Sequence, residues 1–196
     1  MIDHLIVIAG PRAVGKTTIL NKIHKQDSVL NKYFNISSEN EWKLMGLNYI
    51  DKNPNLKFTN LVLHYDFFRP IMRNLKGYKN DSLDQLIQNS TKTDIITLWA
   101  PKNELISRIQ ARIKNKVLPE FEKDKNNPRL KLKLTKLQQI LTIYQSCGRL
   151  DGLYETWLQY TFKEELNNWS LGNSNTFEKL DRINNIFDFF KIKLNN

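Results

Sequence analysis

A glycine-bounded loop near the start of the chain constrains the fold more than any other feature. Residues 10–17 read GPRAVGKT, which is a glycine, four variable residues and then Gly-Lys-Thr. The apolar, β-branched run at residues 5–9 precedes the loop, and residues 16–25 follow it with apolar positions at helical spacing. The first run predicts a strand buried on both faces, and the second predicts an amphipathic helix. The chain therefore opens as strand, loop and helix.

Each fixed position of this loop suits the binding of a polyphosphate. Gly10 and Gly15 let the backbone turn around an anion and bring its N–H groups close to phosphate oxygens. The helix beginning at Lys16 adds the positive end of its dipole, and the Lys16 ammonium can reach the β- and γ-phosphates. The Thr17 hydroxyl is a candidate ligand of Mg²⁺. The alternative is a glycine-bounded turn that binds nothing.

We therefore expect the loop to bind ATP or GTP together with Mg²⁺. The residues expected to contact the nucleotide are Gly10, Arg12, Ala13, Val14, Gly15, Lys16, Thr17 and Thr18.

Two further apolar runs predict strands. Residues 60–65 read NLVLHY and stop at Asp66, and residues 94–99 read DIITLW. Helical patterns at 82–89 and after Pro101 separate and follow them. Strands alternating with helices at this spacing predict right-handed crossovers and a parallel sheet covered on both faces. We expect an α/β fold with three layers, α/β/α, a mostly parallel sheet and a helical C-terminal part, in one domain spanning residues 1–196.

The remaining segments are less regular. Residues 26–60 predict only one or two short helices, and Pro70 suits a first helical turn while disfavouring a helical Arg69. Asp81 is a candidate cap for the helix at 82–89, with Asp84 in the capping-box position. Residues 115–133, rich in Lys, Asn and Pro, predict a mobile basic segment. Helical patterns follow at 134–144, 150–158 and 177–190, and a further strand is expected near 166–171.

Composition limits the partners. The net charge is +10, but Lys is abundant alongside Asn and Ile, and the cations are dispersed along the chain, so a nucleic-acid partner is the less favoured interpretation. No apolar run approaches the roughly 18 residues that cross a membrane, and the N-terminus lacks a secretory pattern. We therefore expect a cytoplasmic protein without a membrane partner. Cys147, the single cysteine, is expected to be buried and unreactive.

The loop and its flanks resemble the P-loop NTPase superfamily. Residues 7–20, VIAGPRAVGKTTIL, are similar to the opening of guanylate-kinase-like and related small-molecule kinases. Residues 95–112, IITLWAPKNELISRIQAR, are similar to the strand, proline and R-x-x-x-R helix before the lid of nucleotide and nucleoside kinases. The residues with which guanylate kinases hold their acceptor base have no recognisable counterpart here, so GMP is not supported as acceptor.

This resemblance implies a mobile lid near residues 112–133. Arg108 and Arg112, four residues apart, would neutralise charge on the transferred phosphoryl group, with Arg129 as a third candidate. The alternative for both is a solvated basic helix face.

Asp66 ends a strand that, in such a fold, lies beside the first strand with its carboxyl end near the phosphates. It could hold magnesium or accept the proton of the acceptor hydroxyl, and the alternative is a turn or capping residue. At most one of His64 and Tyr65 should face the site, and packing roles are favoured for both. Arg69 could bind an anionic acceptor, with a surface ion pair as the alternative.

We expect ATP-dependent, Mg²⁺-dependent phosphoryl transfer to a small-molecule acceptor, with Lys16, Asp66, Arg108 and Arg112 as catalytic residues. A regulatory ATPase would need an acidic pair, whereas Phe67 follows Asp66. The GTPase base-reading pattern is matched only by residues 91–94, which precede a strand instead of following one. A nucleic-acid-associated enzyme, such as a polynucleotide kinase, stays open because of the charge.

Overall fold

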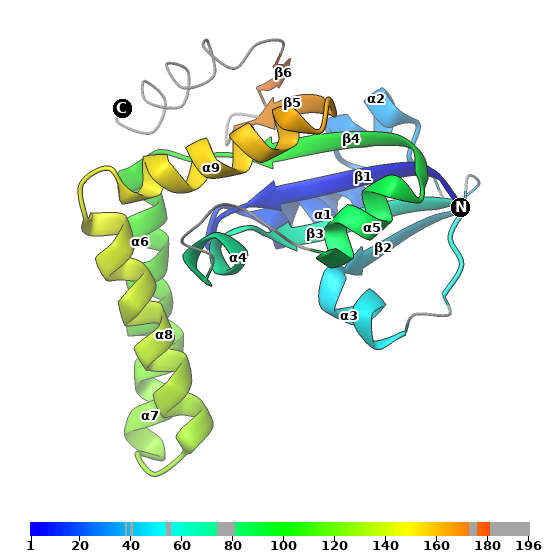
Figure 1. Ribbon diagram of the computed structural model, residues 1–196. Helices are drawn as coiled ribbons and strands as arrows, with labels where there is room; N and C mark the ends of the chain where they lie inside the picture. The colour runs from blue at the N-terminus through cyan, green and yellow to red at the C-terminus, as the bar shows by residue number, and fades with distance from the viewer. Residues whose placement is uncertain (38, 40, 54–55, 74–80, 173–175, 181–196) are drawn as a thin grey trace.

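The computed structural model describes residues 1–37, 39, 41–53, 56–73, 81–172 and 176–180, apart from the side chains of residues 69, 72 and 73. In this part of the chain a six-stranded sheet has the order β2-β3-β1-β4-β5-β6 (Figure 1). The first five strands in that order are mutually parallel, and only β6 is antiparallel to its neighbour. The strands are β1 Ile2–Gly10, β2 Trp42–Gly46, β3 Asn60–Asp66, β4 Ser90–Leu98, β5 Asn167–Leu171 and β6 Phe177–Lys179.

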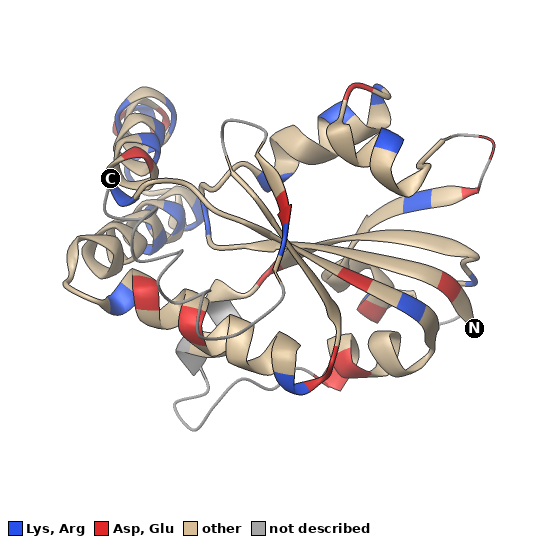
Figure 2. Cartoon of the chain, turned by 90° about the horizontal axis from the view of Figure 1, so that it is seen from above, with Lys and Arg blue, Asp and Glu red and all other residues tan. Residues whose placement is uncertain are grey.

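Helices cover both faces of this sheet, which gives three layers as predicted. Helices α1 and α2 lie on one face and α5 and α9 on the other (Figure 2). The helices are α1 Lys16–His24, α2 Val29–Phe34, α3 Leu47–Lys52, α4 Phe68–Arg73, α5 Asp81–Gln88, α6 Lys102–Arg112, the π-helix η2 Ile113–Val117, α7 Leu118–Lys123, α8 Pro128–Gln145 and α9 Arg149–Lys163. No helix among the described residues is long and apolar enough to cross a membrane.

The core lies on the central strands. Residues 5–9 of β1 are completely buried, as expected for a strand with neighbours on both sides and helices on both faces. From α9, the Trp157 indole donates to Thr97 Oγ1 at 3.0 Å and the Tyr154 hydroxyl donates to the Leu98 carbonyl, also at 3.0 Å. These bonds fix α9 on the carboxyl half of β4.

Residues 102–145 form a helical hairpin that extends away from the sheet (Figure 1). The segment expected to be irregular is helical because its prolines, Pro119 and Pro128, fall in the first turns of α7 and α8, where a backbone N–H has no helical partner. The buried interior of the hairpin consists of Leu105, Ile109, Val117, Leu137, Ile140 and Tyr144. Mobility of this segment stays a prediction.

Several local expectations were wrong. Strand β2 was missed because, in the described part of the chain, it pairs with β3 alone and is only partly buried, so it shows no apolar run. Arg69 is helical, since Pro70 lies in the first turn of α4 and costs no hydrogen bond there. Cys147 is exposed just beyond α8. Phe177 lies in β6, and the helical pattern from residue 181 onward falls outside the described residues.

Asp81 is the first residue of α5, and the Asp84 carboxylate accepts a hydrogen bond from the Tyr160 hydroxyl. Strand β4 starts earlier than predicted, so residues 91–94 lie within it. The Asp94 carboxylate accepts from the Trp169 indole at 2.8 Å and lies 2.6 Å from His4 Nε2. These contacts bury Asp94, so the pattern at 91–94 does not read a base.

Candidate phosphate-binding site

The loop between β1 and α1 takes a conformation that its glycines permit. Gly15, which precedes α1, has φ of 108°, a region that residues with a side chain rarely adopt. A Cβ at Gly10 would lie 2.7 Å from Val14 Cγ1, so only glycine fits there. Ala13 is also left-handed, with φ of 67°. Gly15 is therefore required for its backbone conformation, and Gly10 is required because a side chain would not fit.

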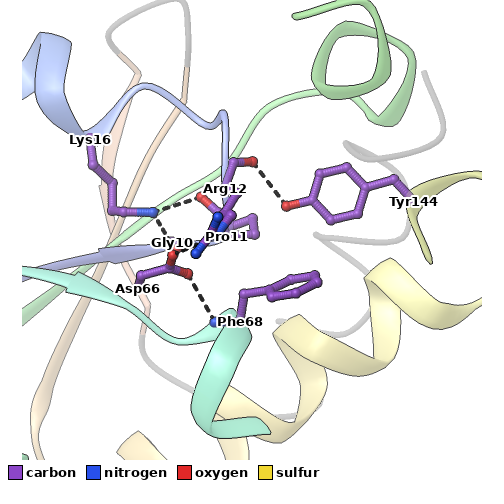
Figure 3. Close-up of polar contacts among 7 residues, drawn as sticks. All are labelled: Gly10, Pro11, Arg12, Lys16, Asp66, Phe68 and Tyr144. Atoms are coloured by element: carbon purple, nitrogen blue, oxygen red, sulfur yellow. Dashed lines mark hydrogen bonds and ion pairs between the residues drawn. The ribbon is translucent and has the colours of Figure 1, made fainter. Parts of the chain in front are cut away.

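Side chains hold every carbonyl of the loop from Gly10 to Val14. The Lys16 ammonium donates to the carbonyls of Gly10 and Pro11, both at 2.7 Å (Figure 3). The Tyr144 hydroxyl, from α8, donates to the Arg12 carbonyl at 2.9 Å. The Arg108 guanidinium, from α6, donates to the carbonyls of Ala13 and Val14 at 3.0 and 3.1 Å. The loop is thus clamped by its own lysine and by two helices of the hairpin.

The amides of the same loop, by contrast, have no acceptors. Among the described residues, the backbone N–H groups from Arg12 to Thr18 make no hydrogen bond within the chain. In a trans peptide the N–H points opposite to the preceding carbonyl, so the amides of Ala13, Val14 and Gly15 face away from Tyr144 and Arg108. Seven consecutive donors at a helix N-terminus form an anion-binding arrangement.

Lys16 is buried, with 7 % of its surface exposed. Burial lowers the pKa of its ammonium to about 8, the nearby Asp66 carboxylate raises this pKa, and the Arg12 guanidinium lowers it. When the buried Lys16 ammonium is charged, it binds an incoming phosphate strongly, because little water screens the contact. Its two carbonyl partners can be exchanged for phosphate oxygens.

Asp66 lies beside the loop because the register pairs Gly10 with Asp66 across β1 and β3. One carboxylate oxygen accepts from Arg12 Nε at 3.2 Å, and the other accepts from the Phe68 amide at 3.1 Å (Figure 3). Asp66 therefore has the turn-capping role of the alternative interpretation, and it also faces the loop. Both of its oxygens keep lone pairs for a further ligand.

A cavity of ≈310 Å³ lies between Asp66, the loop and the hairpin. It brings together the predicted residues Lys16, Thr17, Asp66 and Arg112. In the described part of the chain the exposed Arg112 guanidinium has no hydrogen-bond or ion-pair partner. The remaining lining residues are Arg12, Ala13, Gly15, His64, Ile109 and Leu137.

A second cavity, of ≈450 Å³, also borders the loop. Ala13 and Gly15 line both cavities, whereas Thr18 faces only this one. A Cβ at Gly172 would lie 2.4 Å from the Trp99 ring, so Gly172 makes room for the indole at the cavity wall. The other lining residues are Val14, Ile19, Lys22, Leu98, Glu104, Arg108 and Leu171.

Two candidates do not join the predicted cluster, and a third cannot be placed. The Arg108 guanidinium donates to the loop carbonyls and to Glu104, and it lines the second cavity, not the one that contains Asp66 and Arg112. Arg129 is exposed near the start of α8, roughly 22 Å along the helix from Tyr144 at 1.5 Å per residue. The side chain of Arg69 lies outside the described part of the chain.

Tyr144 was missed as a functional candidate, and His64 was expected to have a packing role. Tyr144 was interpreted as part of an apolar stripe. The sequence indicates only that a buried Tyr hydroxyl needs a hydrogen-bond partner, and it does not indicate which residue that partner is. His64 lines the first cavity, since alternate residues of β3 share a face with Asp66. Burial and the Lys16 charge lower the pKa of His64, and the Asp66 carboxylate opposes this shift. Tyr65 is buried against Trp157, as expected.

Comparisons with known proteins give the following result. No protein-family model matches the chain, and no curated protein sequence matches it. Among solved structures, shikimate kinase from Acinetobacter baumannii in complex with shikimate matches over 85 % of this chain and 96 % of its own length, at 11 % identity and a TM-score of 0.31. A likeness at that level carries no argument about activity, so the site has to be interpreted from its own residues.

Proposed function

We propose that this chain is a magnesium-dependent phosphotransferase that moves the γ-phosphoryl group of ATP to a small-molecule acceptor. The observation that carries the proposal is the loop itself. Among the described residues its seven amides from Arg12 to Thr18 make no hydrogen bond within the chain, and Lys16, Thr17 and Asp66 line one cavity beside it. A polyphosphate is the ligand that satisfies so many donors at once. The six-residue spacing from Gly10 to Lys16 supports the same assignment.

The two cavities support a direction for the nucleotide. The loop residues Ala13 and Gly15 line both, so a triphosphate lying over the loop would reach from one cavity into the other. The larger cavity, with the indole of Trp99 on its wall, suits the nucleoside. The cavity that holds Asp66 and Arg112 then receives the terminal phosphate and the acceptor.

Thr17 and Asp66 have the oxygen ligands that Mg²⁺ prefers, and they line one cavity. When bound, magnesium would neutralise charge on the β- and γ-phosphates. Lys16 would exchange its two carbonyl partners for phosphate oxygens. The unpartnered Arg112 would neutralise charge on the transferred group.

Arg108 receives a different role from the one expected for it. Because its guanidinium holds the carbonyls of Ala13 and Val14, we assign it to positioning the amides that follow them. Its contribution is to nucleotide affinity and not to the transfer step. Ile109 and Leu137 would exclude water from the acceptor side when the hairpin closes.

The test has a binding part and a turnover part. Calorimetry with a non-hydrolysable ATP analogue and Mg²⁺ should show binding to the wild type and to Lys25→Ala, an exposed lysine at the opposite end of α1, but not to Lys16→Ala. Phosphate release from ATP should be slow without an acceptor and should accelerate when hydroxyl- and carboxylate-bearing metabolites are added in pools. A folded wild-type protein that binds no magnesium nucleotide would refute the proposal.

A further inference from the structure

Much of the positive charge of the chain is gathered on the helical hairpin. Residues 112–136 contain nine Lys and Arg and three acidic residues. This stretch therefore has six net positive charges, against +10 for all 196 residues. The fold carries this basic stretch away from the sheet on one projecting hairpin (Figure 1).

These cations are exposed and mostly unpaired. The hairpin extends from the body of the molecule (Figure 1), and bands of Lys and Arg recur on its helices at the left of Figure 2. Within residues 112–136, all of which are described, Lys133 alone has an ion-pair partner, Glu120 at 3.4 Å. The eight others are exposed: Arg112, Lys114, Lys116, Lys123, Lys125, Arg129, Lys131 and Lys136.

We propose that this hairpin is an arm that binds the phosphate backbone of a nucleic acid. A small anion requires cations that converge on one point, whereas these cations are distributed over α6, η2, α7 and α8. The four on α8 alone, at residues 129–136, span roughly 11 Å of the helix axis. Arg129, Lys133 and Lys136 share one helix face, at spacings of four and three residues. An extended array of this kind fits a polymer of phosphates, which releases its counterions on binding.

An anionic membrane is the other extended polyanion, and the packing of the hairpin opposes it. A helix that lies on a membrane inserts an apolar face beside its basic one. The apolar face of α8, with Leu137, Ile140 and Tyr144, is buried within the protein. Leu118 and Leu132 are the exposed large apolar residues of the hairpin, at 36 % and 53 %, and they lie on different helices.

Binding by the arm is independent of the proposed phosphoryl transfer, so the two can fail separately. The experiment uses the full chain without nucleotide and labelled single-stranded RNA, single-stranded DNA and duplex DNA of one length. Fluorescence anisotropy gives the Kd of each probe across about 50 to 200 mM KCl. The test variant is Arg129→Gln, Lys131→Gln and Lys136→Gln together. The matched control removes the same charge from the body, as Lys32→Gln, Lys52→Gln and Lys163→Gln, at exposed positions.

We expect the hairpin variant to bind at least one probe roughly tenfold more weakly and to lower the slope of log K against log salt by about two to three. The body variant should keep most of the wild-type affinity, and both variants should retain the thermal unfolding midpoint of the wild type. Equal losses in the two variants would show that net charge alone is responsible and would overturn the proposal. Binding to phosphatidylserine vesicles with no binding to any nucleic-acid probe would overturn it as well.

Discussion

Removing the Tyr144 hydroxyl would release one of the clamps on the phosphate loop. Tyr144 is completely buried, and its hydroxyl donates to the Arg12 carbonyl at 2.9 Å. The two residues are 132 positions apart in the sequence. Burial raises the pKa of this hydroxyl, and the Asp66 charge raises it further, so it stays protonated and can donate. In Tyr144→Phe the ring still fills its site, but the Arg12 carbonyl loses its partner.

The size of the effect follows from that single bond. Leaving a fully buried carbonyl unsatisfied costs about 1–3 kcal/mol of folding stability, and the partly buried Arg12 carbonyl should cost an amount near the lower end. If nucleotide binding has to order the loop again, the binding free energy becomes less favourable by up to about 1.4 kcal/mol, which raises Kd by as much as tenfold. We therefore expect both a lower unfolding midpoint and a Kd for the magnesium ATP analogue that is roughly three- to tenfold higher.

Tyr154→Phe is the matched control. The Tyr154 hydroxyl is equally buried and also donates to a backbone carbonyl, that of Leu98 at 3.0 Å, but it does not contact the loop. The control should lose comparable stability by thermal unfolding and keep the wild-type Kd by calorimetry. If the two variants bind the nucleotide equally well, the clamp does not position the loop and the reasoning is refuted.

Three further predictions concern the site. Arg112→Ala should lower kcat by about 10²-fold with little change in nucleotide Kd, whereas Arg108→Ala should mainly raise the nucleotide Kd. Steady-state kinetics measures kcat and calorimetry measures Kd, and the reverse pattern would contradict both roles. Nucleotide affinity should fall by up to about tenfold per pH unit above about pH 8, because phosphate binds the charged Lys16 ammonium. The folding stability of the free protein should instead rise between pH 8 and 10.5, because the unfolded chain binds more protons in that range. A flat affinity profile would place the Lys16 pKa elsewhere. Gly172→Ala should destabilise the fold by about 1–3 kcal/mol, because the new Cβ would lie 2.4 Å from the Trp99 ring, and an unchanged melting temperature would contradict this packing.

The local elements of the site could be predicted from the sequence because their signals are local. Residues 5–9 are buried on both faces and read as an unbroken apolar run, and the glycine spacing fixes where the loop begins and where α1 starts. The end of β3 at Asp66 followed from the same kind of run. Edge strand β2 has one neighbour and partial burial, so its residues carry no comparable signal.

A short stretch of sequence was enough to predict that a strand, a glycine-bounded loop and a helix bring Lys16 and Thr17 to one turn, the candidate anion-binding site, since backbone conformation over a few residues suffices for that. Tertiary structure alone decided which side chains hold the turn open. Arg108 and Tyr144 reach the loop from 95 and 132 positions away, and the parallel register of β1 and β3 sets Asp66 beside Gly10. Such contacts depend on how helices pack over a sheet, and no short stretch of sequence records that packing.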